Sequence, residues 1–435
     1  MVSANDSYRV LVSHMGSPPH VRNSVAALYQ AGMLARFATT FVDHPDSKLA
    51  SAIKAVVGRL SPSLTKRFEQ RSAPDIPFDL IRTRPALEVL RTVSERLLQR
   101  PRIADWIWER EEHDLDRWVS GMLGPHLDAV YVYEHGGLAT LLRARARGVV
   151  SFCEFPSAHH SHFGKVYDRE VRAYPELRQT EVSAIHEGAN MARRNARKDH
   201  EAAVADCVLC NSTFTKRTLV ESGVSGEKIE VVPLGCPRPA PKPQRVPDRV
   251  VFLNAGAQSL GKGAHVLYAA WRRLGLSEND GELRLYGESR VPDSFLSGLP
   301  GRVHLRGHVS HSELLDQYRS ASVFVTASLG DGFAMVVAEA MSRGLPVIVT
   351  DATGAADLVE HGVNGFVVPA GDEQALAKQM QWCVDHKDRL PAMGTAAVET
   401  AGGWQWGEYR AALASTVERR IGRHSRRPPP SKVAA

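Results

Sequence analysis

The sequence predicts an α/β protein with two doubly wound, Rossmann-like domains that face each other across a cleft. Three observations support this prediction. The chain has 435 residues, which is too long for one ordinary core. Apolar runs typical of strands alternate with helical runs in both halves of the chain. Between the halves, "PRPAPKPQRVPDR" at residues 237–249 has the composition of a linker.

The first half begins with a strand, "YRVLVSH" at 8–14, a loop, and a helix expected over residues 24–37. Further strands are expected at 129–133, 149–155 and 207–212. Residues 44–125 predict a helix-rich insert, in which the basic, loosely amphipathic stretch 47–68 has three interpretations. It could lie on an anionic membrane, form a wall of an acceptor site, or present a solvated face.

The second half repeats the alternation. The expected strands are at 250–256, 283–287, 303–309, 322–328, 345–351 and 365–370. Ser310 and Glu313 have the spacing of a capping box and predict a helix start. We therefore expect an N-terminal domain over 1–238, a C-terminal domain over 239–398, a last helix over 399–424 and a disordered tail over 425–435.

Composition restricts the class of ligand only mildly. Hydrophobic residues make up 43% and charged residues 23%, as in soluble globular proteins, and the net charge of +6 favours anionic ligands. The basic residues are scattered without interleaved aromatics, so nucleic acid is not expected. The N-terminus lacks the build of a secretory signal, and we expect a cytoplasmic protein, with peripheral contact at the inner membrane face left open.

The five cysteines do not suggest a disulfide framework, because their number is odd and they are widely scattered. Cys207 and Cys210 have CxxC spacing, but no second pair accompanies them as zinc would need. The run "CVLC" reads as a buried strand, and we expect these thiols to fill the core.

The stretch "GDGFAMVVAEAM", residues 330–341, predicts a site for a phosphate. An apolar strand leads into Gly332, and a helix is expected to begin near Phe333 or Ala334. A helix N-terminus presents unpaired N–H groups and a partial positive charge, and Ala334 and Met335 would supply such amides. Gly332 has no Cβ, so the backbone can approach a ligand closely there.

Two acids and one lysine extend this site. Glu339 lies a turn and a half deeper on the same helix, where its carboxylate can accept hydrogen bonds from a diol such as ribose. Asp331, on the loop above, would face the other end of the ligand. In "NAGAQSLGKG", Lys262 follows a strand and a turn and can pair with a phosphate. Both elements follow strands of one domain, where such folds bind ligands.

These residues resemble those of family 4 glycosyltransferases of the GT-B fold. The resemblance is strongest over 250–370, in "GAQSLGKG", "LRLYG", "DGFAMVVAEAMSRGLPVIVTD" and "HGVNGFVVPAGD". It implies an enzyme that moves a sugar from a nucleotide-diphosphate sugar to an acceptor hydroxyl, with retention of configuration and without a metal or cofactor. It also implies that the last helix, from "WQWGEY" onward, crosses back to the first domain.

The resemblance assigns roles to the donor-side residues. It implies that Asp331 contacts the sugar hydroxyls and that Glu339 contacts the ribose. Lys262 would neutralise the diphosphate as it leaves. The backbone amides implied to hold the diphosphate belong to Gly332, Phe333, Ala334, Met335 and Val336. Gly256 is the turn glycine of the lysine element, and Ala257 stands where the family often has Arg.

In the first domain the resemblance points to the end of the strand "VVSFCEF", where many members carry a histidine. Here the position holds Glu154, followed by "PSAHHSH". Glu154 could orient the acceptor or stabilise a cationic transition state. Alternatively, His159 or His160 could take the acceptor's proton. The loop with Gly16 and Ser17 would lie under the donor phosphates.

Three alternatives stay open at this point. A sugar-nucleotide epimerase can share the fold, and so can a non-catalytic subunit that binds sugar nucleotides. A metal-dependent transferase would need Asp-x-Asp at a strand end, but Asp114–Asp116 lies in a charged helical pattern that we expect to be solvated. The donor's base and sugar are not predicted. The acceptor could be a small molecule, a natural product or a lipid-linked sugar.

Overall fold

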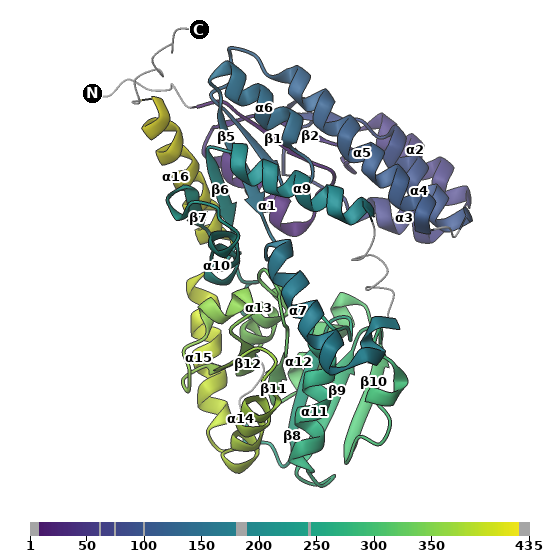
Figure 1. Cartoon of the computed structure of the whole chain (residues 1–435), viewed down its shortest axis with the longest axis vertical. Coiled ribbons are helices and arrows are strands. Elements are labelled where there is room, and N and C mark those ends of the chain that lie inside the picture. The colour runs from purple at the N-terminus through teal and green to yellow at the C-terminus, as the bar shows by residue number, and fades with distance from the viewer. Residues whose placement is uncertain are drawn as a thin grey trace.

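The computed structural model describes residues 8–60, 62–73, 75–98, 101–179, 189–241 and 245–425. Figure 1 shows two sheet-centred domains, one above the other along the long axis of the molecule. All strand pairs within the two sheets are parallel. The predicted α/β class with two doubly wound domains is confirmed. The predicted disordered tail lies, apart from its first residue, outside the described residues.

The first sheet has seven strands in the order β3-β2-β1-β4-β5-β6-β7. Their bounds are β1 Val10–His14, β2 Leu34–Thr39, β3 Ile81–Thr83, β4 Ala129–Tyr133, β5 Val150–Phe155, β6 Cys207–Cys210 and β7 Ile229–Val231. The strand order reverses between β1 and β4, which are hydrogen-bonded neighbours. Loops that follow these two strands therefore open at the switch point, where doubly wound sheets bind ligands.

The second sheet has six strands in the order β10-β9-β8-β11-β12-β13. Their bounds are β8 Val250–Ala255, β9 Gly281–Tyr286, β10 Arg302–Gly307, β11 Val323–Val325, β12 Val347–Thr350 and β13 Gly365–Val368. Here the order reverses between β8 and β11. The loop with Lys262 follows β8 and the loop with Asp331 follows β11, so the fold itself brings these two loops together.

Helices cover both sheets. In the first half they are α1 Pro19–Gln30, α2 Lys48–Leu60, α3 Pro62–Glu69, α4 Ala86–Leu98, α5 Pro101–Met122, α6 Leu138–Arg147, α7 His160–Ala173, α9 Ala189–Val204 and α10 Thr213–Glu221. In the second half they are α11 Ala264–Leu274, α12 His311–Ser320, α13 Met335–Ser342, α14 Glu373–Asp385, α15 Leu390–Gly403 and α16 Trp406–Ser425. The predicted capping box at Ser310 is present at the start of α12. The described helices include none with the length and apolar composition needed to span a membrane.

Two helices connect the domains. α7 follows a strand of the first sheet but packs on the second domain, where Val166 and Tyr167 join its core and Glu170 lies 3.0 Å from His265 Nε2. α16 follows the second domain and lies against α1 of the first (Figure 1). There the Tyr409 hydroxyl lies 2.8 Å from Ser24 Oγ.

The structure corrects two local predictions in the first half. The helix expected over 24–37 ends at Gln30, because Gly32 has a φ of 70° and breaks it; Leu34 then begins β2. The insert over 44–125 is helix-rich as expected, but it also contributes the edge strand β3. The α2–α5 helices cluster at the end of the first domain opposite α16 (Figure 1). The CxxC thiols are buried in β6, as the sequence predicts.

The domains meet closely at Gly332. A Cβ added to this residue would lie 1.9 Å from the carbonyl oxygen of Pro156, just after β5. The Gly332 carbonyl accepts a hydrogen bond of 2.7 Å from Ser212 Oγ, which also belongs to the first domain. The glycine that the sequence assigns to ligand approach is therefore required by the neighbouring backbone.

We predict that Gly332→Ala destabilises the protein by at least about 2 kcal/mol, because its methyl group can fit only if two backbones move apart. Gly407→Ala is the matched control, since nothing lies within 4 Å of a Cβ at that position in α16. It should raise stability by up to about 1 kcal/mol through helix propensity. Urea unfolding measures both. Equal stability of Gly332→Ala and the wild type would contradict the close contact.

Candidate active site

Lys262 and Asp331, predicted to share a site, contact each other. Lys262 Nζ forms an ion pair with Asp331 Oδ2. Gly256 (φ 137°) allows the turn after β8, and Gly263 (φ 65°) precedes α11. A Cβ on Gly263 would lie 1.8 Å from the Ala327 carbonyl oxygen, so the β8 and β11 loops are in close backbone contact. This packing holds the lysine over the second loop.

Asp331 also organises the start of α13. Its Oδ1 accepts hydrogen bonds from the amides of Ala334 (2.9 Å) and Phe333 (3.3 Å). Ala334 has a left-handed φ of 63°, a strained conformation for a residue with a Cβ. The helix begins at Met335, slightly later than predicted, and Val336 follows in its first turn. Two of the amides expected to hold a diphosphate thus bond to the aspartate.

Glu339 lies deeper on α13, as predicted, with its side chain 14% exposed. Its Oε1 lies 3.1 Å from His311 Nε2, and its Oε2 accepts a hydrogen bond of 3.4 Å from the Tyr318 hydroxyl. Both partners belong to α12. The carboxylate is therefore fixed in orientation while it keeps contact with solvent.

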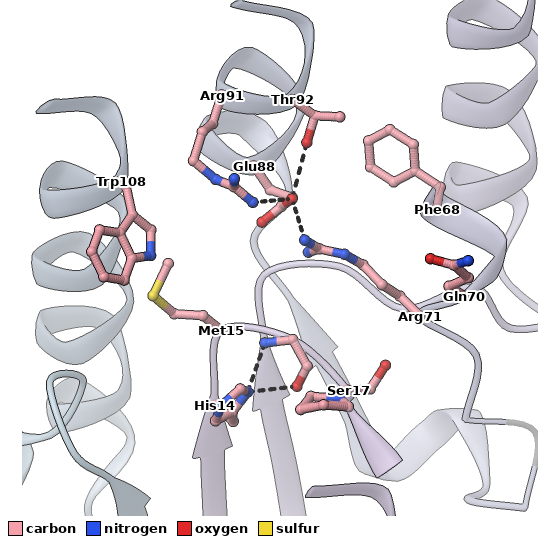
Figure 2. A pocket seen from close by; sticks show the side chains of 12 residues that line it. His14, Met15, Ser17, Phe68, Gln70, Arg71, Glu88, Arg91, Thr92 and Trp108 are labelled. Atoms are coloured by element: carbon pink, nitrogen blue, oxygen red, sulfur yellow. Dashed lines mark hydrogen bonds and ion pairs between the residues drawn. The ribbon is translucent and has the colours of Figure 1, made fainter. Parts of the chain in front are cut away.

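Gly16 and Ser17 lie in a pocket of the first domain. Its volume is about 360 Å³, and it is formed by the loop after β1 and by the insert helices (Figure 2). The insert contributes Phe68, Gln70, Arg71, Glu88, Arg91, Thr92 and Trp108. The pocket has the size of a small-molecule site. The interpretation of the insert as a wall of a binding site fits this arrangement.

Glu154 is almost fully buried, with 3% exposure, near the end of β5. It accepts a hydrogen bond of 2.5 Å from the Tyr131 hydroxyl of β4. Burial raises its pKa to about 7, although the hydrogen bond from Tyr131 acts in the opposite direction. Glu154 is therefore shielded from solvent, and it is not among the residues that line the pocket.

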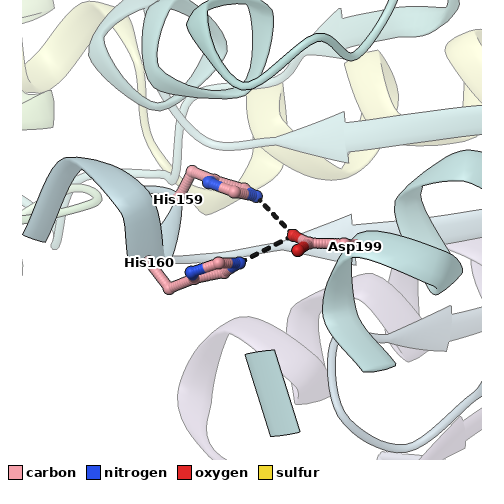
Figure 3. A group of neighbouring side chains, drawn as sticks. All are labelled: His159, His160 and Asp199. Carbon is pink, nitrogen blue, oxygen red and sulfur yellow. Dashed lines mark hydrogen bonds and ion pairs between the residues drawn. The ribbon is translucent and has the colours of Figure 1, made fainter. Parts of the chain in front are cut away.

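His159 and His160 both contact Asp199 of α9 (Figure 3). Their Nε2 atoms lie 2.9 and 2.7 Å from the same oxygen, Asp199 Oδ1. His159 also caps α7, because its Nδ1 accepts a hydrogen bond of 3.3 Å from the Ser161 amide; the Ser161 Oγ lies 2.8 Å from the same nitrogen. Burial lowers the pKa of His159. Among the described residues this is the only trio of potential metal ligands, but both imidazoles are engaged by the carboxylate.

Several polar residues near the pocket were not predicted from the sequence. His14 ends β1, and burial and His20 lower its pKa to about 3, so it is neutral at pH 7. His135, after β4, has a strained φ of 76°, and its ring lies 6.0 Å from that of Trp108. For both histidines the available signal was a polar residue at or just beyond the end of an apolar strand. The sequence around the insert residues Arg71 and Glu88 contains no comparable signal.

Asp116, expected to be solvated, is buried. It accepts hydrogen bonds from the amides of Ala139 (2.8 Å) and Thr140 (2.9 Å) and pairs with Arg197 at 3.0 Å. The expectation failed because α5 packs on the start of α6, which needs an acceptor there. Asp116 thus caps a helix within the first domain.

Comparison with known proteins links the second domain to one enzyme family. Residues 248–386 match the family described as glycosyl transferases group 1. The D-inositol 3-phosphate glycosyltransferase 1 of Catenulispora acidiphila is 30% identical over 37% of this chain and 42% of its own length. The amylovoran biosynthesis glycosyltransferase AmsK of Erwinia amylovora is 28% identical over 50% of this chain and 58% of its own. The chain thus spans about half the length of these curated relatives.

Solved structures resemble the whole chain. A sucrose-phosphate synthase from Thermosynechococcus elongatus superposes with a TM-score of 0.57 at 17% identity, covering 96% of this chain and 100% of the other. Anabaena HepE in complex with UDP gives 0.56 at 15% identity, covering 95% and 100%. At these identities the likeness shows the fold. Together the comparisons confirm the predicted resemblance to glycosyltransferases of the GT-B fold.

We predict that Glu154→Gln becomes more stable relative to the wild type as the pH rises. The pKa of Glu154 is about 7 in the folded protein against 4.5 as its ordinary value, so the folded wild type loses stability between these two pH values. The neutral amide of the variant does not titrate, so the variant keeps the roughly 3 kcal/mol of unfolding free energy that the wild type loses. Urea unfolding at pH 4.5 and pH 8 measures the difference. Glu221→Gln, at an exposed position that ends α10, is the control and should show no such trend.

Proposed function

We propose that this chain, whose residues 248–386 match the glycosyl transferases of group 1, transfers a sugar from a nucleotide-diphosphate sugar to an acceptor hydroxyl. One observation carries the proposal. Lys262, Asp331 and the start of α13 converge at the switch point of the second sheet, with Glu339 a turn and a half deeper. The cation and the helix N-terminus suit a diphosphate, and the two carboxylates suit the hydroxyls of the sugar and the ribose on either side of it.

Each donor-side residue then has a distinct task. Lys262 and the first amides of α13 hold the diphosphate and stabilise the charge that develops on it as the sugar leaves. Asp331 positions the lysine and binds sugar hydroxyls. Glu339, oriented by His311 and Tyr318, accepts hydrogen bonds from the ribose.

Glu154 and His159 act as positioning residues in this proposal. Their polar atoms are engaged by Tyr131, Asp199 and Ser161. They flank the segment that carries Pro156, against which Gly332 rests. They hold this segment of the first domain in place where it borders the site.

The donor and the stereochemistry are part of the proposal. Solved neighbours hold UDP, UDP-glucose, or UDP with glucose, which makes a UDP-sugar the first donor to test. Retention and metal independence are carried over from the family resemblance. The matched relatives are named as transferases, so we put forward transfer ahead of epimerisation or a non-catalytic role. Cytoplasmic location and peripheral membrane contact stay predictions.

A thermal-shift screen with UDP, GDP, ADP, dTDP and CDP, each also as a sugar conjugate, tests the proposal. A nucleotide at 100 times its Kd stabilises by about 2.7 kcal/mol, which is readily seen. We expect one base to raise the melting temperature, equally in EDTA and in Mg²⁺. A shift that requires Mg²⁺ would contradict metal independence. No shift with any nucleotide would overturn the donor site.

We predict that Glu339→Ala weakens binding of that nucleotide by at least about tenfold, the cost of losing a hydrogen bond to a charged group. Glu399→Ala, at an exposed position of α15 in the same domain, should leave the affinity unchanged. Isothermal titration measures both. An unchanged affinity in a folded Glu339→Ala protein would remove the ribose assignment.

A further inference from the structure

The pocket of the first domain has two unlike walls. Met15 and Trp108 lie on one side, and Gln70 and Arg71 face them from the other (Figure 2). Trp108 is held in place by the guanidinium of Arg194, which lies 4.3 Å from its ring centroid. An aromatic surface opposite a cationic one suits a ligand that carries both a carbon skeleton and a charged group.

Arg71 keeps hydrogen-bonding capacity on the pocket side. Its Nη2 pairs with Glu88 Oε1 at 2.7 Å. Its buried Nη1 has no hydrogen-bond partner among the residues that the structure describes. That nitrogen lies 3.9 Å from the position of a Cβ on Gly16, and so it faces the loop after β1. A guanidinium N–H buried without an acceptor is costly unless a ligand provides one.

Ser17 supplies a second unused donor on the same loop. Its side chain is 2% exposed and lines the pocket. Its Oγ likewise has no hydrogen-bond partner in the described ranges. Arg71 and Ser17 therefore provide two buried donors in the lining of one pocket, where a ligand that accepts hydrogen bonds could satisfy them.

The balance of charge at the pocket is positive. Two arginines, Arg71 and Arg91, surround Glu88, which pairs with both at 2.7 and 2.8 Å. Glu111, 3.1 Å from Arg91, is the second acid of the cluster. Burial and the Glu88 carboxylate raise the pKa of Glu111, which disfavours a second full negative charge beside the two arginines. Two guanidinium groups therefore face the single carboxylate that pairs with both of them.

We propose that this pocket is the acceptor site and that it takes a small acceptor bearing an anionic group, a phosphate or a carboxylate, bound by Arg71 and Ser17. The inference rests on the proposed transferase function. It adds the chemical class of the acceptor, which the second domain does not specify. Ser17, expected from the family resemblance to lie under the donor phosphates, is assigned here to the acceptor's anion instead. The donor's diphosphate is assigned to Lys262 and α13, so the acceptor's anion and the donor bind together.

Titration of the purified protein with inorganic phosphate, glucose 6-phosphate, glucuronate and glucose tests the proposal, with and without a saturating nucleotide from the screen above. We expect at least one anion to bind with a Kd below roughly 10 mM, glucose alone to bind more weakly, and the anion to bind in the presence of the nucleotide. A vesicle arm with phosphatidic acid identifies the source of a phosphate. If the protein sediments with the vesicles and Arg71→Lys does not, the phosphate belongs to a lipid acceptor. If both proteins sediment equally, the vesicles bind outside the pocket, and the phosphate belongs to a soluble acceptor.

Two variants locate the anion. Arg71→Lys can keep the ion pair with Glu88 but removes the second nitrogen, and it should weaken anion binding at least tenfold. Ser17→Ala removes a hydroxyl that makes no bond within the described protein, so folding is preserved, and it should weaken binding about threefold or more. Ser13→Ala is the matched control, because its Oγ is also buried without a partner but does not line the pocket. Its anion affinity should equal that of the wild type.

The failures of the two proposals are distinguishable. If a nucleotide binds but no anion does, the anionic acceptor is overturned and the transferase stands. If the nucleotide displaces the anion competitively, Arg71 serves the donor's diphosphate, and the acceptor class is overturned. If no nucleotide binds, the transferase function fails, and the acceptor role fails with it. Equal effects of Ser13→Ala and Ser17→Ala would also overturn the site.

Discussion

Two stretches of backbone, one from each domain, meet where Gly332 lies against the carbonyl of Pro156. A side chain at this point would force them apart, so the contact sets how closely the loop before α13 approaches the end of β5. Ser212 reinforces it with a hydrogen bond to the Gly332 carbonyl. The same carbonyl oxygen would lie only 1.8 Å from a Cβ on Gly354, so a second residue must also be small. Asp331, next to Gly332, owes its position to this packing.

Arginines hold two of the buried acids in the first domain. Glu88 is shared by two arginines, and Arg197 pairs with Asp116. Burying such ions is expensive, and a pair repays the cost only with good geometry. The insert helices supply Glu88 and Asp116, so these ion pairs add to their apolar contacts, such as those of Leu115 and Val119 in the core of the first domain. Those helices build the pocket and stabilise it by the same contacts.

The sequence predicted the strands well where apolar runs end in a polar turn, as at Ala129–Tyr133, which is β4 residue for residue. It failed at β2, because "MLARF" continues a helical pattern and only Gly32 marks the break. In the second domain, the proximity of Lys262 and Asp331 was predictable because each follows a strand, and neighbouring parallel strands end at one edge. Arg71 and Glu88 were not, because their partners lie on other elements of an insert whose packing has no periodic signature. Asp116 shows the same limit, since a charged helical pattern does not reveal which acid caps another helix.

Two chain segments that connect the domains, residues 233–236 and 404–406, run side by side. The Cys236 amide donates to the Trp404 carbonyl at 2.8 Å, and Trp404 Nε1 donates to the Pro233 carbonyl at 3.0 Å. A Cβ on Gly235 would lie 2.5 Å from the backbone of Trp406, so the segments are also in close contact. A single segment between two domains permits torsion about its own axis, whereas two hydrogen-bonded segments resist it. Less rotational freedom is then lost when both domains bind the same molecule.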